Sequence, residues 1–84
     1  MKQPDTAVQR SPMTGEERKR AFKSAVAARG TSLSAAALLS CGVTWDHLSR
    51  GISDNYETPL SAEVKTRFAN YIGKRVEEVF GVAA

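Results

Sequence analysis

Residues 32–52 read Ser-Leu-Ser-Ala-Ala-Ala-Leu-Leu-Ser-Cys-Gly-Val-Thr-Trp-Asp-His-Leu-Ser-Arg-Gly-Ile, and this stretch decides the fold. Its first half is rich in alanine, leucine and serine, has no proline and ends at Gly42. This pattern predicts a short, closely packed helix with Ser32 or Ser34 as its cap. Thr44 is a good N-cap for a second short helix, which carries an acidic side chain in its first turn. We therefore expect two short helices on either side of a glycine turn.

The second short helix is expected at residues 44–52. Gly51 lowers its helix propensity by roughly 1 kcal/mol, which favours an end near Arg50. The position of Val43 and Leu48 relative to the helix axis places both on its inner side. We expect the opposite side to face outward.

A longer helix is predicted before this pair. Thr14 and Glu17 have the spacing of a capping box, in which each side chain bonds to the backbone N–H of the other residue. Apolar residues then recur at three- and four-residue intervals, and Gly30 offers a left-handed C-cap. We expect this helix at residues 15–29.

Two further helices are predicted after the pair. Thr58 and Pro59 indicate a helix start, with threonine as the cap and proline at the first helical position, and Gly73 marks its end. Val76–Phe80 is a short amphipathic segment that stops at Gly81. The residues assigned to the core share this apolar spacing, and they are Leu60, Val64, Phe68, Ile72, Val79 and Phe80.

Length and composition fit one small folded domain. The chain has 84 residues and a mass of 9.1 kDa, with 42% hydrophobic and 25% charged residues. A disordered chain would hold fewer apolar residues, and a second domain would need more length. The fold class we expect is all-α, a compact bundle of about five short helices over residues 14–84, with a flexible N-terminal arm over residues 1–13.

Several function classes lack the residues that they need. Cys41 and His47 are the only cysteine and histidine, so no zinc site and no pair of nucleophile and base can be assigned. We therefore expect no enzyme activity, no metal, no cofactor and no small-molecule ligand. The N-terminal residues lack the apolar run of a signal peptide or membrane span, which favours a cytoplasmic location. The net charge of +3 and the pI near 9.4 favour an anionic partner.

Five segments of the chain occur in a recognisable order. Arg29–Leu33, Gly42–Thr44 and His47–Arg50 follow one another as a helix entry, a turn with its cap and a second short helix. Thr58–Leu60 and Val76–Phe80 supply a helix that starts at proline and a closing helix. Together these segments resemble the lambda-repressor-like (Cro/XRE) helix-turn-helix domain. Arg29–Leu33 is also similar to the small Ner-type regulators of transposable phages.

This resemblance implies a sequence-specific regulator of transcription, of the phage or prophage repressor type, that binds double-stranded DNA with helix 44–52 in the major groove. Its target is then an operator, and a homodimer would reach two half-sites one helical turn apart. A protein-interaction module, such as an antitoxin-like protein or an adaptor, is the alternative. The chain departs from the family pattern at Leu38, because an alanine usually lies four residues before the turn glycine. The register of the first motif helix therefore stays open.

The candidate residues for reading bases lie on the second motif helix. By position, Trp45, Asp46, Ser49 and Arg50 face outward. Arg50 can donate two parallel hydrogen bonds to O6 and N7 of guanine, or it can simply be solvated or cap backbone carbonyls at the helix end. Asp46 can accept from N4 of cytosine, orient a neighbouring arginine or serve only the helix dipole. Trp45 can lie against a thymine methyl group or belong to the core.

Four other candidates would contact the DNA backbone from the helix starts and the connector. Thr44 and Ser34 are placed as phosphate contacts, and each has helix capping as a competing role. Asn55 and Tyr56 lie in a connector where the family often touches the backbone. Both are also ordinary turn residues.

Affinity for phosphate must come largely from cations outside the second motif helix. Residues 44–57 hold one arginine against three carboxylates, a net charge of −2. Arg18 and Lys19 on the first helix, together with the basic residues of the N-terminal arm, are the candidates for this role. A run of charges on a helix is equally the pattern of a solvated face.

Overall fold

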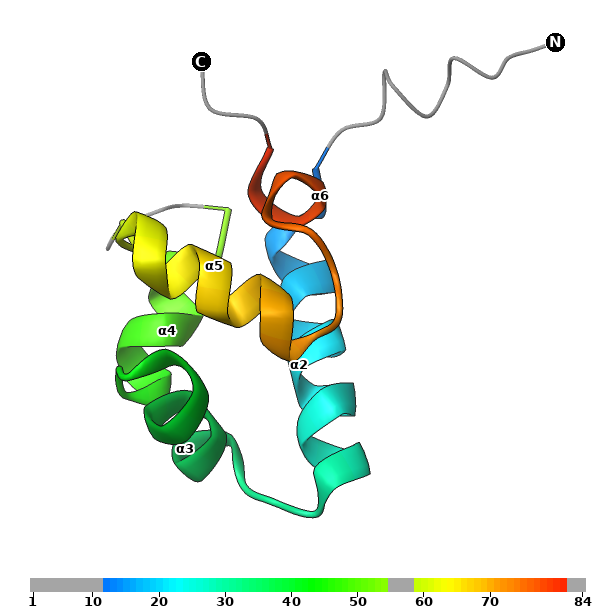
Figure 1. The fold of residues 1–84 in the computed structure, drawn as a ribbon, viewed down its shortest axis with the longest axis vertical. Coiled ribbons are helices and arrows are strands. Elements are labelled where there is room, and N and C mark those ends of the chain that lie inside the picture. The colour runs from blue at the N-terminus through cyan, green and yellow to red at the C-terminus, as the bar shows by residue number, and fades with distance from the viewer. Residues whose placement is uncertain (1–11, 55–58, 82–84) are drawn as a thin grey trace, which may run out of the picture.

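The computed structural model describes residues 12–54 and 59–81, and these residues form helices joined by short turns without any strand. Helix α2 runs along one side of the molecule, with α3 and α4 on the other side (Figure 1). Helix α6 lies at the end of the molecule where α2 begins (Figure 1). The elements are α2 (Gly15–Arg29), α3 (Leu33–Ala36), the π-helical segment η1 (Ala37–Cys41), α4 (Trp45–Gly51), α5 (Ala62–Tyr71) and α6 (Val76–Phe80). The expected all-α fold is confirmed, while the arm at residues 1–13 lies almost entirely outside the described residues.

Helix α2 begins and ends where its capping signals predict. The hydroxyl of Thr14 accepts a hydrogen bond from the backbone N–H of Glu17 at 3.1 Å, and the Glu17 carboxylate accepts from the Thr14 N–H at 2.9 Å. At the other end, Gly30 adopts the left-handed conformation with φ of 68°, which side chains disfavour. The expected bounds of 15–29 are confirmed.

The two short helices are separated at Gly42, as expected. Gly42 has φ of 79°, so the chain leaves the first helix in a left-handed turn that glycine allows at little cost. The Ser32 hydroxyl caps α3 by accepting from the backbone N–H of Ala35, and the Thr44 hydroxyl caps α4 by accepting from that of His47. Helix α4 ends at Gly51, one residue before the expected bound.

The first short helix differs from its expected form because its second half widens into the π-helical segment η1. The N–H of Gly42 donates to the carbonyl of Ala37 at 3.0 Å and to that of Leu38 at 3.1 Å. A π turn holds more residues than an α turn and rotates the following side chains around the axis. In this segment Ala37 and Cys41 are buried, while Leu38 is 54% exposed and Leu39 84% exposed.

Helix α5 starts later than the sequence indicates. The expected start at Thr58 and Pro59 is wrong, because Pro59 precedes the helix and the first helical residue is Ala62. The cap is Ser61, whose hydroxyl accepts from the backbone N–H of Val64 at 3.2 Å. Thr58 itself lies outside the described residues. A serine cap followed by an acidic first turn outcompetes the proline signal.

An aromatic stack forms the centre of the core. Phe22 is fully buried, and its ring lies 5.4 Å from that of Phe68 with an angle of 18° between the two planes. Leu48 and Ile52 are also fully buried, so the end of α4 belongs to the same core. Among the predicted core residues, three are buried and three are partly buried against them: Leu60, Phe68 and Val79, then Val64, Ile72 and Phe80.

Candidate nucleic-acid interface

The outer side of α4 carries the polar residues that were predicted to lie there. Thr44, Asp46 and Arg50 are exposed, and Ser49 is partly exposed. The guanidinium of Arg50 lies 3.5 Å from the Asp46 carboxylate, one helical turn away. The Ser49 hydroxyl donates to the backbone carbonyl of Asp46 at 3.1 Å. Arg50 therefore has a carboxylate partner and remains open to solvent.

Trp45 is directed toward the core, and its predicted outward orientation is wrong. Its ring stacks on that of Phe22 from α2, with centroids 5.4 Å apart and planes only 6° from parallel. The residue is partly buried. A stacked aromatic pair of this kind stabilises the fold by about 0.5–1.5 kcal/mol beyond the area that it buries. The core role left open for Trp45 is the one that its geometry supports.

The starts of the two short helices place Ser34 and Thr44 at the surface. The hydroxyl of Thr44 already accepts the capping hydrogen bond from His47. Ser34 is exposed in the first turn of α3, and the cap there is Ser32, so the capping role proposed for Ser34 is wrong. A hydroxyl that caps a helix still presents its own proton outward, so Thr44 can combine both roles.

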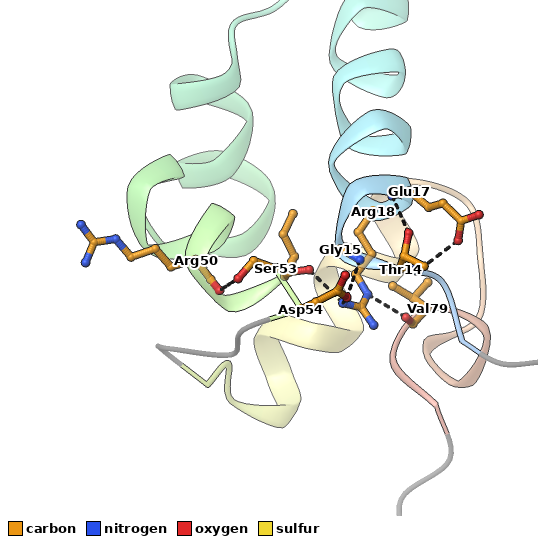
Figure 2. A network of polar contacts seen from close by, with 9 residues as sticks. Thr14, Gly15, Glu17, Arg18, Arg50, Ser53, Asp54 and Val79 are labelled. Atoms are coloured by element: carbon orange, nitrogen blue, oxygen red, sulfur yellow. Dashed lines mark hydrogen bonds and ion pairs between the residues drawn. The ribbon is translucent and has the colours of Figure 1, made fainter.

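Arg18 does not lie on the surface, and its predicted phosphate contact is wrong. Only 1% of the residue is exposed. Its Nε donates to the carbonyl of Val79 at 2.8 Å, and its Nη1 donates to the carbonyl of Ile52 at 2.8 Å (Figure 2). Its position one turn before Phe22 places it on the inner face of α2, and this spacing was the available signal in the sequence.

The N-terminus of α2 contacts the segment that follows α4, which the sequence did not indicate. The backbone N–H of Gly15 donates to the Asp54 carboxylate at 2.7 Å, and the same oxygen lies 3.9 Å from the guanidinium of Arg18 (Figure 2). A Cβ atom on Gly15 would lie 2.7 Å from the backbone nitrogen of Asp54 and 2.9 Å from Cα of Ser53. Glycine at position 15 is thus required by the close approach of the two segments.

Lys19 lies on the outer surface of α2. It borders a shallow hollow of about 460 Å³ on the side of α2 that faces away from the core. The residues of this hollow are Glu16, Lys19, Arg20, Lys23, Ser24 and Ala27. The remaining candidates, Asn55 and Tyr56, and the basic residues of the arm lie outside the described residues.

Cys41 offers no reactive thiol. Burial raises the pKa of the Cys41 thiol above its ordinary value, and this effect outweighs the hydrogen bond with Ser40 and the positive charge of Arg67, which both lower it. The thiol is therefore protonated at neutral pH and packs as a small apolar group.

No protein-family model, curated protein or solved structure matches this chain. In the part of the chain that the structure describes, no His, Cys, Asp and Glu side chains gather in a group that could hold a metal ion. No helix among residues 12–54 and 59–81 has the length and apolar character needed to span a membrane. The outer side of α4, with the adjoining helix starts, presents exposed polar side chains and is the candidate site.

Proposed function

We propose that this protein is a sequence-specific, double-stranded DNA-binding regulator of transcription that inserts α4 into the major groove. The observation that carries the proposal is the sharp break at Gly42 between two short helices, with the polar side of α4 left open to solvent. A helix of seven residues is about 10 Å long. The major groove of B-DNA is about 12 Å wide and admits one helix.

The starts of α3 and α4 are suited to the DNA backbone. Each has backbone N–H groups in its first turn. Ser34, in the first turn of α3, and Thr44, the N-cap of α4, are exposed hydroxyl residues at these starts. Hydroxyl groups and helix N-termini are common phosphate contacts, and they fix the register of a protein on the duplex without reading its sequence. In the proposed complex these contacts hold α4 at the correct depth in the groove.

Arg50 is the proposed base-reading residue. In the free protein it pairs with Asp46, and an exposed pair of this spacing is worth only about 0.3–0.5 kcal/mol. Because this pair is weak, the guanidinium can leave Asp46 at little cost. Its two parallel hydrogen bonds to guanine would give about 1–3 kcal/mol of discrimination against other bases. Asp46 then either accepts from a cytosine N4 or keeps one edge of the guanidinium in place.

The electrostatic contribution to DNA affinity must come mainly from cationic residues outside α4. Because Arg18 is buried, the phosphate contacts of α2 reduce to Lys19 and its basic neighbours on the outer surface. In the repressor mechanism that we propose, two copies occupy an operator and block the polymerase. No cofactor takes part, and regulation follows from the concentration of the protein.

Selection of bound duplexes from a random pool tests this function. The expected result is an enriched palindromic motif with a guanine at the position read by Arg50. The same protein should bind a random duplex more than about tenfold more weakly at 200 mM than at 50 mM salt, since phosphate contacts release counterions. Absence of duplex binding at both salt concentrations would contradict the proposal.

The alternative, a protein-interaction module of the antitoxin or adaptor kind, also has an observation in its favour. Leu38 and Leu39 are the only large hydrophobic side chains exposed among the described residues. Exposed apolar groups that lie together often mark an interaction surface. The salt titration separates the two functions, because an adaptor of this kind retains no duplex at either concentration.

A further inference from the structure

Helix α4 is too short and too little buried to hold its own orientation. Among its seven residues only Leu48 and Gly51 are buried. A helix gains most of its stability in a protein from packing of an apolar face, and two buried positions make a narrow face. Contacts at the two ends of α4 therefore add to the packing of Leu48 in setting its orientation.

Both ends of α4 are attached to α2. At the first end, the ring of Trp45 stacks on Phe22. Just past the other end, the carbonyl of Ile52 accepts from Arg18, and the carboxylate of Asp54 accepts from the N–H of Gly15. Arg18 and Phe22 are one turn apart on the same inner face of α2. One face of α2 thus contacts both ends of α4.

The guanidinium of Arg18 suits this role because it is planar and its donors point in fixed directions. One donor holds the carbonyl after α4, and another holds the carbonyl of Val79 in α6. The group also lies over the ring of Phe80, 4.9 Å from its centroid. Arg18 therefore fixes the position of the end of α4 relative to both α2 and α6. By contrast, the side chain of Arg50 points away from this network (Figure 2).

We infer that Arg18 is a positioning residue for DNA recognition, which acts on the base-reading residues through the backbone at the end of α4. This inference rests on the proposed function. Arg18 touches no DNA in this account, and it fixes the angle at which α4 enters the groove. A change at Arg18 should therefore reduce the preference for the operator more than the affinity for DNA in general.

The test compares Arg18→Lys with the wild-type protein. Lysine keeps the positive charge but lacks the fixed fork of donors. The readout is the ratio of the Kd for a random duplex to the Kd for the selected duplex, measured where unfolding curves show both proteins to be folded. We expect the ratio to fall by about tenfold, the size of one lost bidentate base contact, with little change in the random-duplex Kd. Lys74→Arg exchanges the same two residue types at an exposed position between α5 and α6, so it is the matched control and should keep the wild-type ratio.

Asp54→Ala provides a second variant in case Arg18→Lys does not fold. The Asp54 side chain is 67% exposed, so its removal leaves the core intact. Loss of a carboxylate strengthens binding to every duplex, whereas release of the α4 end weakens binding to the operator, so the ratio should fall by about threefold. A wild-type ratio in a folded Arg18→Lys protein, or in Asp54→Ala if the first does not fold, would overturn the inference and leave the proposed function standing. A wild-type protein that binds no duplex would overturn both.

Discussion

Two arginines, Arg18 on α2 and Arg50 on α4, show how differently one residue type is used in this fold. Arg18 is 1% exposed and donates to two backbone carbonyls, whereas the Arg50 side chain is 57% exposed and faces only Asp46. Both occur in short polar runs that suggest surface positions. The difference arises from the helix face, because Arg18 shares its face with the buried residues Phe22 and Val26, whereas Arg50 lies on the exposed side of α4. The buried arginine therefore organises the fold, and the exposed one remains available for a partner.

The largest effect expected from this comparison is on stability. Arg18→Ala should lower the free energy of unfolding by about 3 kcal/mol, because it leaves two buried carbonyls without a donor and opens a cavity. Arg50→Ala should change it by less than about 0.5 kcal/mol, since an exposed pair contributes little. Urea unfolding followed by circular dichroism measures both values. Equal stability losses in the two variants would show that the buried network does not matter.

The close approach at Gly15 should give the next largest effect. Gly15→Ala places a Cβ atom against the backbone of Ser53 and Asp54, and relief of that overlap requires a backbone shift. Overpacking of this kind costs about 1–3 kcal/mol. Ser24→Ala, at an exposed position on the outer face of α2, is the matched control and should have almost no effect. Thermal unfolding that is unchanged in Gly15→Ala would mean that the two segments are not held together.

For DNA affinity, the order of the two arginines should reverse, because Arg50 is proposed to contact DNA and Arg18 is not. Arg50→Ala should weaken binding to the selected duplex by about 1–3 kcal/mol and relax the preference at one base pair, while the fold stays intact. Fluorescence anisotropy with the selected duplex and its single-position variants measures this change. If the loss were equal on every sequence, Arg50 would be a phosphate contact and would not read a base.

The buried thiol of Cys41 should make the stability of the fold depend on pH. Burial raises its pKa above the ordinary value of 9.0, so the unfolded chain loses this proton at lower pH than the folded protein does. The buried, protonated thiol thus contributes its full stabilisation below the ordinary pKa, and this stabilisation is lost as the pH rises through the folded-state pKa. Wild-type protein should lose stability more steeply than Cys41→Ala above about pH 9. Parallel stability curves for the two proteins would argue against a buried thiol.

The smallest effect is expected where a large apolar side chain is exposed. Leu39→Ser should change the free energy of unfolding by less than about 0.5 kcal/mol, because Leu39 is 84% exposed in η1. Ala37→Leu, two residues away at a fully buried position, should cost about 1–3 kcal/mol through overpacking. Paired urea titrations test which face of η1 is buried. A larger cost at Leu39 than at Ala37 would show that the assigned inner face of η1 is wrong.

The helices with strong local signals were predictable from the sequence. The bounds of α2 and α6 match their expected residues, and the caps at Thr14, Ser32 and Thr44 form the hydrogen bonds that their residue types favour. These signals act within one helical turn, so sequence spacing alone contains them. The start of α5 was missed because Pro59 and Ser61 offer competing local starts only two residues apart.

The candidate site was only partly predictable, because its decisive contacts link distant parts of the chain. Arg18 donates to carbonyls that are 34 and 61 residues away in the chain. Because every residue has a backbone carbonyl, the sequence does not indicate which ones accept these hydrogen bonds. The helical face of Arg18 was visible in its spacing from Phe22 and Val26, but its charge favoured a surface position. The exposed positions of Asp46 and Arg50 followed correctly from the helical pattern around Leu48.

Whether α4 is the DNA-binding helix can be tested by mapping the backbone amide NMR shifts that change when a selected duplex is added. The changes should concentrate at the start of α3 and along residues 44–50, with smaller changes near Lys19. Changes centred on Leu38 and Leu39, or no change on α4 at saturating duplex, would contradict this role of α4.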